Sequence, residues 1–351
     1  MASSSLTNPF RRRISVAPMM DCTDRHYRYL LRLISKYVLL YTEMITTGAL
    51  LHGDSVRFLA YDQMEHPVAL QLGGSEPAEM ARCARMAQDA GYDEVNMNVG
   101  CPSDRVKSGF FGACLMAEPQ RVADCVAAMI ASVNIPVTVK TRIGIDDKDT
   151  YEELCAFVQL VAQAGCEVFT IHARKAWLQG LSPKQNREIP PLCYDVVYRL
   201  KKDFPNLHIG INGGIRTFGE IDKHLKHIAS VMIGRVAYQN PYFLSELDTR
   251  FFESTQAIRS REEILEDYLI YIERQLAQGV YLKHISRHLL GLFQGMPGAK
   301  AWRRTISENA CRPDAGCEVI RDAARHVLAR SYRQDPVQVN SSAMQQTAFA
   351  V

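Results

Sequence analysis

The sequence predicts a (β/α)8 TIM barrel followed by a C-terminal helical domain. Between residues 14 and 245, eight short runs rich in Val, Ile and Leu alternate with helical or mixed segments, a pattern typical of parallel strands covered by helices. Polar side chains gather where these runs end, as they do at the ligand-binding face of a barrel. Near residue 262 the alternation stops and helical patterning follows. We therefore divide the chain into a flexible N-terminus, a barrel, a helical domain and a disordered tail, at residues 1–13, 14–245, 246–334 and 335–351.

The strands and helices of the predicted barrel follow one another without a long break. Thr23 or Asp24 is a suitable N-cap for the first helix, and polar loop residues around Gly48 follow the second strand. Eight such units fit a closed barrel better than an open doubly wound sheet, which usually has fewer strands. The predicted strands are 14–21, 39–45, 67–74, 94–98, 136–144, 167–173, 208–214 and 230–237. The predicted helices are 24–36, 77–90, 119–133, 150–164, 194–203 and 218–227, and in the helical domain 262–278, 281–293, 299–310 and 316–330.

Composition excludes several classes of protein. The chain has 351 residues, of which 47% are hydrophobic and 23% charged. It contains no apolar run long enough to span a membrane and no signal-peptide core, so we expect a cytoplasmic protein. Its ten cysteines form no Cys-x-x-Cys pair and no His/Cys cluster at zinc spacing, which argues against a metal site or a disulfide framework. A net charge of +3 is by itself too small to indicate a nucleic-acid partner.

Seven of the predicted strands end in polar residues or glycines. A single residue of this kind is more often a solvated side chain at the rim, but their recurrence favours a shared site. Glycines after the last two strands suit a phosphate group, because they let backbone N–H groups approach its oxygens. Two tight turns would also explain these glycines, although the adjacent Arg235 favours phosphate. The residues are Met19, Met20, Gln71, Asn98, Lys140, Arg142, His172, Arg174, Asn212, Gly213, Gly214, Gly234 and Arg235.

Cys101 is expected on a stiff turn after the fourth strand, between Gly100 and Pro102. It could be a half-buried packing residue, since free cysteines are usually buried. It could be a nucleophile, but that role needs a neighbouring base, and only His172 could approach it in space. It could also be a proton donor, because thiols are mostly protonated at neutral pH.

The predicted rim suits a flavin mononucleotide (FMN). A phosphate site, the amine of Lys140 and the side-chain amides of Gln71 and Asn98 match a ring that needs hydrogen bonds and gains from a nearby cation when it is reduced. A resident nicotinamide dinucleotide is less suitable, because no Gly-x-Gly-x-x-Gly motif follows a strand. Beside such a ring, the thiol of Cys101 would act as a proton donor.

One stretch of the helical domain is strongly basic. Between Val280 and Ser307 there is no acidic residue, yet five basic residues are present: Lys283, Arg287, Lys300, Arg303 and Arg304. Like charges at i and i+4 cost a helix roughly 0.2–0.5 kcal/mol each. The stretch therefore suggests an external anion, with a solvated helix face as the alternative.

Several motifs resemble those of the tRNA-dihydrouridine synthases. They are Ala-Pro-Met-Met-Asp (17–21), Asn-Val-Gly-Cys-Pro (98–102) with Gly112-Ala113 downstream, Val-Lys-Thr-Arg (139–142), His-Ala-Arg (172–174), Asn-Gly-Gly-Ile (212–215) and Ile-Gly-Arg (233–235). The resemblance covers residues 14–330. The loop 172–192 is similar to that of the bacterial A-type branch, whose members act on the D-loop uridines 20 and 20a.

The resemblance implies an FMN flavoprotein that uses NADPH or NADH to reduce the C5=C6 bond of uridine in tRNA. A hydride passes from the reduced flavin to C6, and Cys101 protonates C5, after the base has been extruded from the folded RNA. No metal, membrane or obligate protein partner is implied, and a monomer would suffice. The implied FMN contacts are Pro18, Met19, Met20, Gln71, Lys140, His172, Asn212, Gly213, Gly214, Gly234 and Arg235. The implied tRNA contacts are Asn98, Lys184, Arg187, Lys300 and Arg303.

Two other functions stay open on the sequence. A flavin barrel could act on a free pyrimidine or another small molecule, with the helical domain serving assembly. The chain could instead be a non-catalytic RNA-binding module, although RNA binding alone does not need so many polar residues on one rim.

Overall fold

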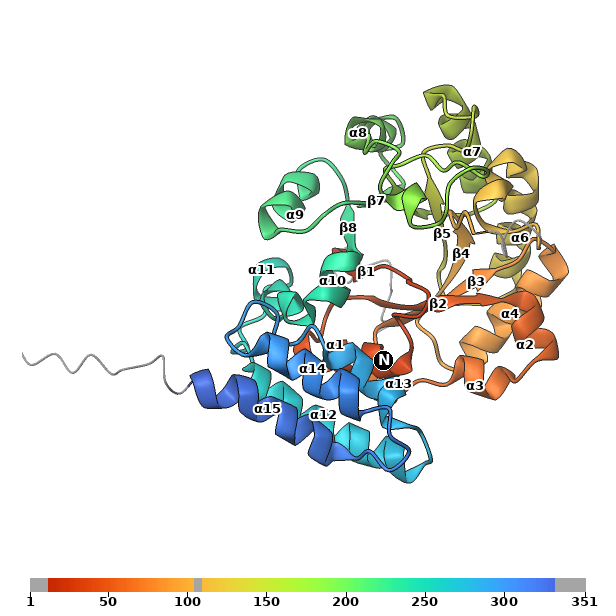
Figure 1. Ribbon diagram of the computed structural model, residues 1–351. Helices are drawn as coiled ribbons and strands as arrows, with labels where there is room; N and C mark the ends of the chain where they lie inside the picture. The colour runs from red at the N-terminus through yellow and green to blue at the C-terminus, as the bar shows by residue number, and fades with distance from the viewer. Residues whose placement is uncertain (1–11, 104–108, 332–351) are drawn as a thin grey trace, which may run out of the picture. The chain divides into compact units, whose positions relative to one another are not determined.

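Eight parallel strands form the framework of the first of two compact units. The computed structural model describes residues 12–103 and 109–331 (Figure 1). The units are Met1–Ile264 and Leu265–Val351, and each is described by itself. Most of the predicted flexible N-terminus, and the whole predicted disordered tail, lie outside the described residues, and the domain boundaries drawn from the sequence stay predictions.

The strands follow one another in a ring. Their order is β1-β8-β7-β6-β5-β4-β3-β2, and each neighbouring pair is parallel. A parallel bridge between Ser15 and Leu39 joins β1 to the start of β2, with Val16 N donating to Leu39 O at 2.9 Å. The predicted (β/α)8 barrel is confirmed. The strands are β1 (Ile14–Val16), β2 (Leu40–Thr46), β3 (Val68–Gly73), β4 (Glu94–Val99), β5 (Val137–Arg142), β6 (Val168–His172), β7 (His208–Asn212) and β8 (Ser230–Ile233).

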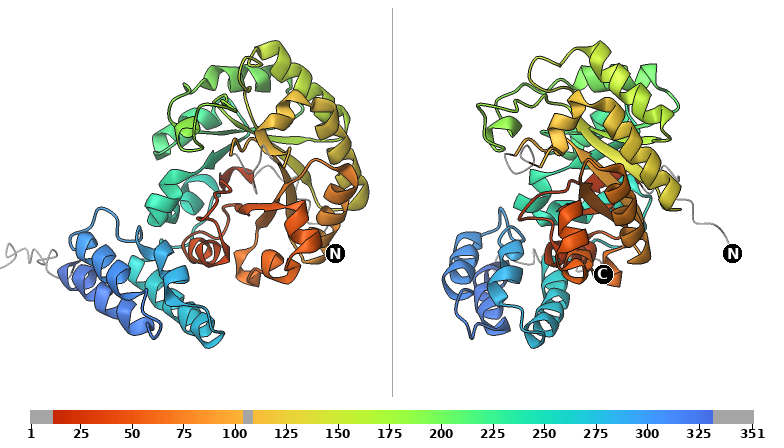
Figure 2. Two further views of the ribbon diagram at one scale, coloured as in Figure 1. Left: turned by 45° about the vertical axis from the view of Figure 1, so that its right-hand side comes forward. Right: turned by 90° about the vertical axis from the view of Figure 1, so that its right-hand side faces the viewer.

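Helices cover the outside of this barrel (Figure 2). Capping residues define several of their first turns: Asp24 caps α1, and Thr150 and Thr217 form capping boxes with Glu153 and Glu220. The helices of this unit are α1 (Arg25–Ile34), α2 (Thr47–His52), α3 (Ser55–Leu59), α4 (Pro77–Asp89), α6 (Pro119–Ser132), α7 (Tyr151–Gln163), α8 (Tyr194–Asp203), α9 (Phe218–Leu225), α10 (Arg235–Gln239) and α11 (Leu247–Phe251). Short 3-10 turns are η2 (Gln63–Glu65), η3 (Gly112–Ala117), η4 (Gln185–Arg187) and η5 (Pro241–Glu246).

Three local predictions in the barrel are wrong. The first strand ends at Val16 rather than at residue 21, because Pro18 has no N–H to donate to a neighbouring strand. The eighth strand ends at Ile233, and Gly234 is the N-cap of α10. The predicted polar loop around Gly48 is instead the helix α2, whose N-cap Thr46 accepts a hydrogen bond from Ala49 N.

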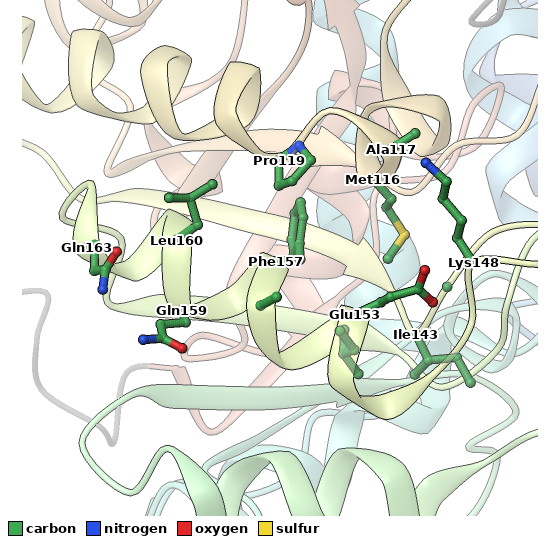
Figure 3. Close-up of a pocket in the computed structure, with 13 residues that line it drawn as sticks. Met116, Ala117, Pro119, Ile143, Lys148, Glu153, Phe157, Gln159, Leu160 and Gln163 are labelled. Carbon is green, nitrogen blue, oxygen red and sulfur yellow. The ribbon is translucent and has the colours of Figure 1, made fainter.

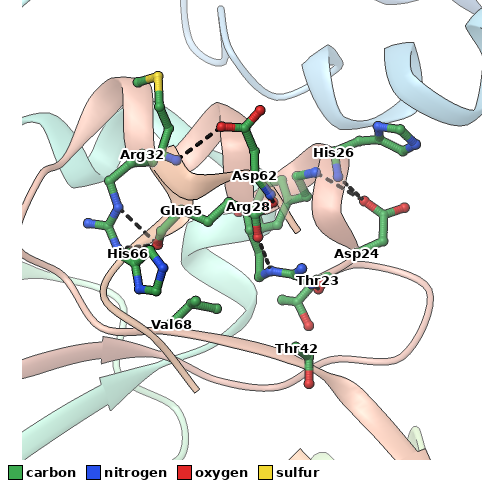
Figure 4. A network of polar contacts seen from close by, with 12 residues as sticks. Thr23, Asp24, His26, Arg28, Arg32, Thr42, Asp62, Glu65, His66 and Val68 are labelled. Carbon is green, nitrogen blue, oxygen red and sulfur yellow. Dashed lines mark hydrogen bonds and ion pairs between the residues drawn. The ribbon is translucent and has the colours of Figure 1, made fainter. Parts of the chain in front are cut away.

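Buried arginines attach α1 to the loop before β3 (Figure 4). Arg28 Nε donates to Glu65 Oε2 at 2.6 Å in a fully buried ion pair. Arg32 donates to the carbonyl oxygens of Ser35, Val38, Glu65 and Pro67. Burial lowers the pKa of Arg32 to about 10. These contacts satisfy backbone carbonyls that would otherwise be buried without a partner.

The C-terminal unit is helical, as predicted. Trp302 is fully buried, its Nε1 donates to Leu289 O at 3.0 Å, and its ring lies edge-on against Phe293. The predicted helix 281–293 is wrong in length, because α13 ends at Ser286, between the like charges of Lys283 and Arg287. The elements are α12 (Arg261–Ala277), which crosses the division between the units, α13 (Leu282–Ser286), η6 (Arg287–Leu289), α14 (Ala299–Asn309) and α15 (Cys317–Ser331). In the described part of the chain, none of the helices has the length and apolar character needed to cross a bilayer.

Candidate active site

Residues on four neighbouring strands meet at the carboxyl end of the barrel. In the sheet register, Asn98 of β4 lies opposite Lys140 of β5. His172 of β6 lies opposite Arg142 of β5 on one side and Asn212 of β7 on the other. The closure of the ring therefore brings together strand-end residues that are up to 114 positions apart in the sequence (Asn98 to Asn212).

Hydrogen bonds hold the turn that carries Cys101. Asn98 Oδ1 accepts from the backbone N–H groups of Gly100 at 3.0 Å and Cys101 at 2.9 Å. Cys101 O accepts from Ala113 N at 2.9 Å. Its partly buried Sγ lies 3.5 Å from Ser103 Oγ. The thiol is thus presented on a turn that is fixed on both sides.

Lys140 reaches across the barrel interior. Its Nζ donates to Asn212 Oδ1 at 3.1 Å, and Asn212 Nδ2 donates to Met232 O at 2.7 Å. Burial and the charge of Arg142 lower the pKa of Lys140 to about 7, against an opposing influence of Cys101. The amine is therefore close enough to Cys101 to interact with it electrostatically, and it can gain or lose a proton near neutral pH.

His172 is neutral at neutral pH. Its pKa lies well below the ordinary value because it is buried, and because the cations Arg142 and Lys140 are close to it. A neutral imidazole has one donating and one accepting nitrogen. His172 can therefore bind a ligand by hydrogen bonds without adding positive charge.

The glycines after β7 are required by the backbone and by their surroundings. Gly213 has φ +119° and Gly214 has φ +75°. A Cβ on Gly213 would lie 2.7 Å from His172 Cδ2, and one on Gly214 would lie 2.5 Å from Leu192 Cδ1. At Gly234 a Cβ would meet nothing closer than 3.8 Å. Space therefore demands glycine after β7 but not after β8.

A loop from residue 175 to 192 lies beside these strand ends and carries three basic residues: Lys175, Lys184 and Arg187. Asn186, which is fully buried, accepts from Trp177 N at 2.8 Å and donates to Trp177 O and Leu181 O. Lys184 and Arg187, on either side of Asn186, are exposed. Glu188 Oε1 accepts from Arg235 at 3.2 Å. The loop is thus anchored by its centre, and Lys184, Arg187 and Glu188 are exposed.

Arg142 connects this loop to the cysteine turn. Its Nε donates to Gly100 O at 2.8 Å, and its NH1 donates to Lys175 O and Asn186 O at 3.1 and 3.2 Å. The sequence predicted Arg142 as a strand-end residue but gave it no role. Only the closed barrel shows that its guanidinium lies between the two loops.

The remaining predicted site residues lie in less enclosed positions. Met19 packs on a cluster that includes Tyr41 and Met232, while half of the Met20 surface is exposed. Pro18 is partly buried beside them. In the C-terminal unit, Lys300 is exposed and Arg303 donates to Gln294 Oε1 at 3.2 Å. Among residues 265–331, neither of these two cations pairs with a carboxylate.

Sequence reasoning missed a set of buried polar residues under the rim. They are Glu94, Asn96 and Thr138, each 1% exposed. A signal for them exists, because β4 alternates Glu94, Asn96 and Asn98 with Val95, Met97 and Val99. Strands of parallel barrels are usually apolar almost throughout, so such alternation indicates polar groups inside the barrel.

A hollow on the outer wall is separate from this site. It has a volume of about 470 Å³ and lies between α6 and α7, with Phe157 and Leu160 on one side and Met116 and Pro119 on the other (Figure 3). None of the predicted site residues lines it. Within residues 12–103 and 109–331, no group of three His, Cys, Asp or Glu side chains is placed to hold a metal ion.

Comparison with known proteins gives a family for most of the chain. Residues 15–328 match the family model described as dihydrouridine synthase. The tRNA-dihydrouridine(20/20a) synthase of Vibrio parahaemolyticus is 63% identical over 312 residues, which cover 89% of this chain and 95% of that protein. The protein of the same name from Escherichia coli K12 is 59% identical over 316 residues, covering 90% and 91% of the two chains.

A solved structure shares the fold at much lower identity. It is a complex of 2-naphthoyl-CoA reductase with 2-naphthoyl-CoA, with a TM-score of 0.53 and 12% identity, covering 68% of this chain and 50% of that one. At this identity the similarity supports the barrel architecture alone.

Proposed function

Because the chain belongs to the dihydrouridine synthase family, we propose that it reduces uridines 20 and 20a in the D-loop of tRNA to 5,6-dihydrouridine. The observation that carries the proposal is the thiol of Cys101 on a turn pinned by Asn98, beside the buried amine of Lys140. Saturation of a C=C bond next to a carbonyl needs a proton at one of its carbons, which a thiol can donate, and a nearby cation stabilises the negative charge that hydride addition places on the carbonyl.

The family is flavin-dependent, and the residues at the strand ends fit FMN as the flavin. Two glycines with positive φ follow β7, and because they carry no side chain their backbone N–H groups can approach a phosphate. Lys140 and the neutral His172 can meet the polar edge of the ring. The residues proposed to hold FMN are Pro18, Met19, Met20, Gln71, Lys140, His172, Asn212, Gly213, Gly214, Gly234 and Arg235.

When it is bound, FMN supplies the hydride for C6 of the uracil, with NADPH or NADH as the source of electrons. The Cys101 thiol donates its proton to C5, which completes the saturation of the C5=C6 bond, and the thiolate recovers a proton from solvent. Asn98 has its oxygen occupied by the turn, and its Nδ2 carries a second N–H beyond the one given to Gln71. That N–H is proposed to orient the base.

Binding of tRNA is proposed to rest on exposed or half-buried cations. Lys184 and Arg187 lie on the loop beside the strand ends, and Lys300 and Arg303 lie on α14. Contacts of this kind recognise the phosphates and shape of folded RNA, and their contribution falls as the salt concentration rises. Since tRNA is the substrate, we propose a cytoplasmic location.

The test combines a spectrum with a product map. The purified protein should show flavin absorbance. With NADPH and unmodified tRNA it should form dihydrouridine at positions 20 and 20a, but it should leave free uridine almost unchanged. A folded, colourless protein that binds tRNA would contradict a flavin enzyme, and equal activity on free uridine would favour a small-molecule oxidoreductase.

A further inference from the structure

A continuous chain of hydrogen bonds runs through the barrel interior from Glu94 to the cysteine turn. Six of its seven members lie on the four neighbouring strands β2, β3, β4 and β5, and the seventh, Arg12, precedes β1. The lower part is buried: Glu94, Asn96, Gln71 and Thr138 are each 1% exposed. Bulk water does not reach these side chains, so an unmatched donor or acceptor among them is costly. The seven residues are Arg12, Tyr41, Gln71, Glu94, Asn96, Asn98 and Thr138.

The hydrogen-bond chain begins at the carboxylate of Glu94, which only accepts hydrogen bonds. Arg12, whose guanidinium has no acceptor atom, contacts Glu94 Oε2. Tyr41 donates to Glu94 Oε1 at 2.9 Å, and the hydroxyl of Thr138 donates to the same oxygen. Thr138 has a single hydroxyl hydrogen, so its oxygen can only accept from its other neighbour.

The orientation of every later side chain follows from that constraint. Asn96 must turn Nδ2 toward Thr138 Oγ1, at 2.8 Å, and this leaves its Oδ1 to accept from Gln71 Nε2 at 2.7 Å. Gln71 then presents Oε1 to Asn98 Nδ2, at 2.8 Å. Asn98 Oδ1 is thereby directed at the backbone N–H groups of Gly100 and Cys101.

We propose that Asn96 and Thr138 are positioning residues: they relay the acceptor character of Glu94 up the barrel, fix the amide orientations of Gln71 and Asn98, and so hold the Cys101 turn. An inverted amide at any step would set two donors or two acceptors against each other in a dry interior. Thr138 touches neither the base nor the cofactor in this scheme. The consequence for catalysis rests on the proposed function, whereas the consequence for the turn does not.

The test compares two substitutions at one position. Thr138→Val keeps the shape and removes the hydroxyl, while Thr138→Ser keeps the hydroxyl. In the holoenzyme, we expect Thr138→Val to raise the rate of Cys101 alkylation by iodoacetamide by about fivefold or more as the turn loosens. Thr138→Ser should react like the wild type. The exposed Cys311, followed in the same peptide map, should react equally in all three proteins.

The second readout is steady-state kinetics with tRNA. A displaced thiol should lower kcat by about tenfold or more in Thr138→Val, with KM changed less than about twofold and flavin content preserved. Thr138→Ser should restore kcat. If the wild type forms no dihydrouridine, the proposed function fails. The alkylation rates still decide whether the hydrogen-bond chain holds the Cys101 turn.

The result that overturns the inference is equally direct. It is a Thr138→Val protein with wild-type Cys101 alkylation and wild-type kcat, even if its melting temperature falls. Should Thr138→Val not fold, Thr138→Cys takes its place, because a thiol is a weak donor of similar size. Thr138→Cys should then show faster Cys101 alkylation and a lower kcat than both the wild type and Thr138→Ser, though by less than expected for Thr138→Val. Wild-type values in both readouts would again overturn the inference.

Discussion

Lys140 Nζ donates to Asn212 Oδ1 at 3.1 Å, although β6 separates the strands that carry these two residues. The contact crosses the interior of the barrel rather than running along the sheet. Burial in that interior, with Arg142 nearby, lowers the pKa of Lys140 to about 7. Keeping Lys140 protonated in this interior therefore costs folding free energy, and the amine lies beside other residues proposed to bind FMN.

This cost predicts a pH-dependent gain in stability when the amine is removed. With a folded-state pKa near 7 and an ordinary value of 10.5, the folded state binds fewer protons between these limits, so the free energy of unfolding rises with pH there. Lys140→Met removes this dependence. In flavin-depleted protein we expect its Tm to exceed that of the wild type at pH 6, by roughly 2–4 °C for each kcal/mol regained. The difference should shrink toward pH 9.5, and a constant difference in thermal melts across this range would contradict the prediction.

Loss of the thiol should separate colour from activity. Cys101→Ala is expected to keep its flavin absorbance and to form dihydrouridine roughly 10²–10⁴ times more slowly, the usual contribution of a positioned acid. Cys311→Ala removes an exposed thiol in the other unit and should be unchanged in both respects. The measurement is the initial rate of product formation in tRNA at saturating NADPH. A Cys101→Ala rate within threefold or so of the wild type would remove this residue from the chemistry.

Two glycine substitutions should have opposite effects. Gly213→Ala puts a side chain at φ +119° and 2.7 Å from His172 Cδ2, so we expect a loss of about 1–3 kcal/mol in stability and of bound flavin. Gly219, near the start of α9, has no atom within 4 Å of an added Cβ. Gly219→Ala should therefore keep its flavin and gain up to about 1 kcal/mol. Denaturant unfolding and flavin content check both, and equal behaviour of the two variants would refute the steric argument.

The clamp made by Arg142 should couple two loops. Lysine keeps the charge but cannot donate to Gly100 O and to the loop carbonyls of Lys175 and Asn186 in one fixed fork. We expect Arg142→Lys to lower kcat by about tenfold to a hundredfold and to expose the loop 175–192 to proteolysis. Arg121→Lys, at an ion pair with Glu76 on the surface, is the matched control. Protease resistance equal to that of the control would argue against the coupling.

Charge reversal on α14 should act on tRNA alone. The double variant Lys300→Glu and Arg303→Glu is expected to weaken tRNA binding and to reduce the slope of log K against log salt by roughly 1–2, since each phosphate contact contributes about 0.7–0.9. Bound FMN should be unaffected. Arg325→Glu on α15, where the wild-type residue is exposed and pairs with Asp322, serves as the control. Binding titrations at several salt concentrations decide, and an unchanged slope would remove α14 from the interface.

Sequence patterns were sufficient to predict the barrel, its C-terminal helices and the strands whose ends carry polar residues. These features depend on local patterns: the recurrence of apolar runs, the glycines after β7, and the cap Asp24. Local sequence patterns did not predict where the strands β1 and β8 end. Residues 230–237 include Gly234 and Arg235, but the residue types alone do not show that β8 ends at Ile233 and that Gly234 caps a helix, because a strand ends where its neighbours stop pairing with it.

The tertiary structure alone decided how the polar residues are connected. The hydrogen bonds of Gln71 with Asn96 and of Lys140 with Asn212 join residues 25 and 72 positions apart. In the proposed scheme, which atom of each amide donates depends on Glu94 and Thr138, which become neighbours only when β4 pairs with β5. The sequence shows which hydrogen bonds each polar side chain is able to donate or accept. The partner that uses this capacity is set by the packing of strands distant in the chain, and so the support beneath Cys101 became visible only in the folded barrel.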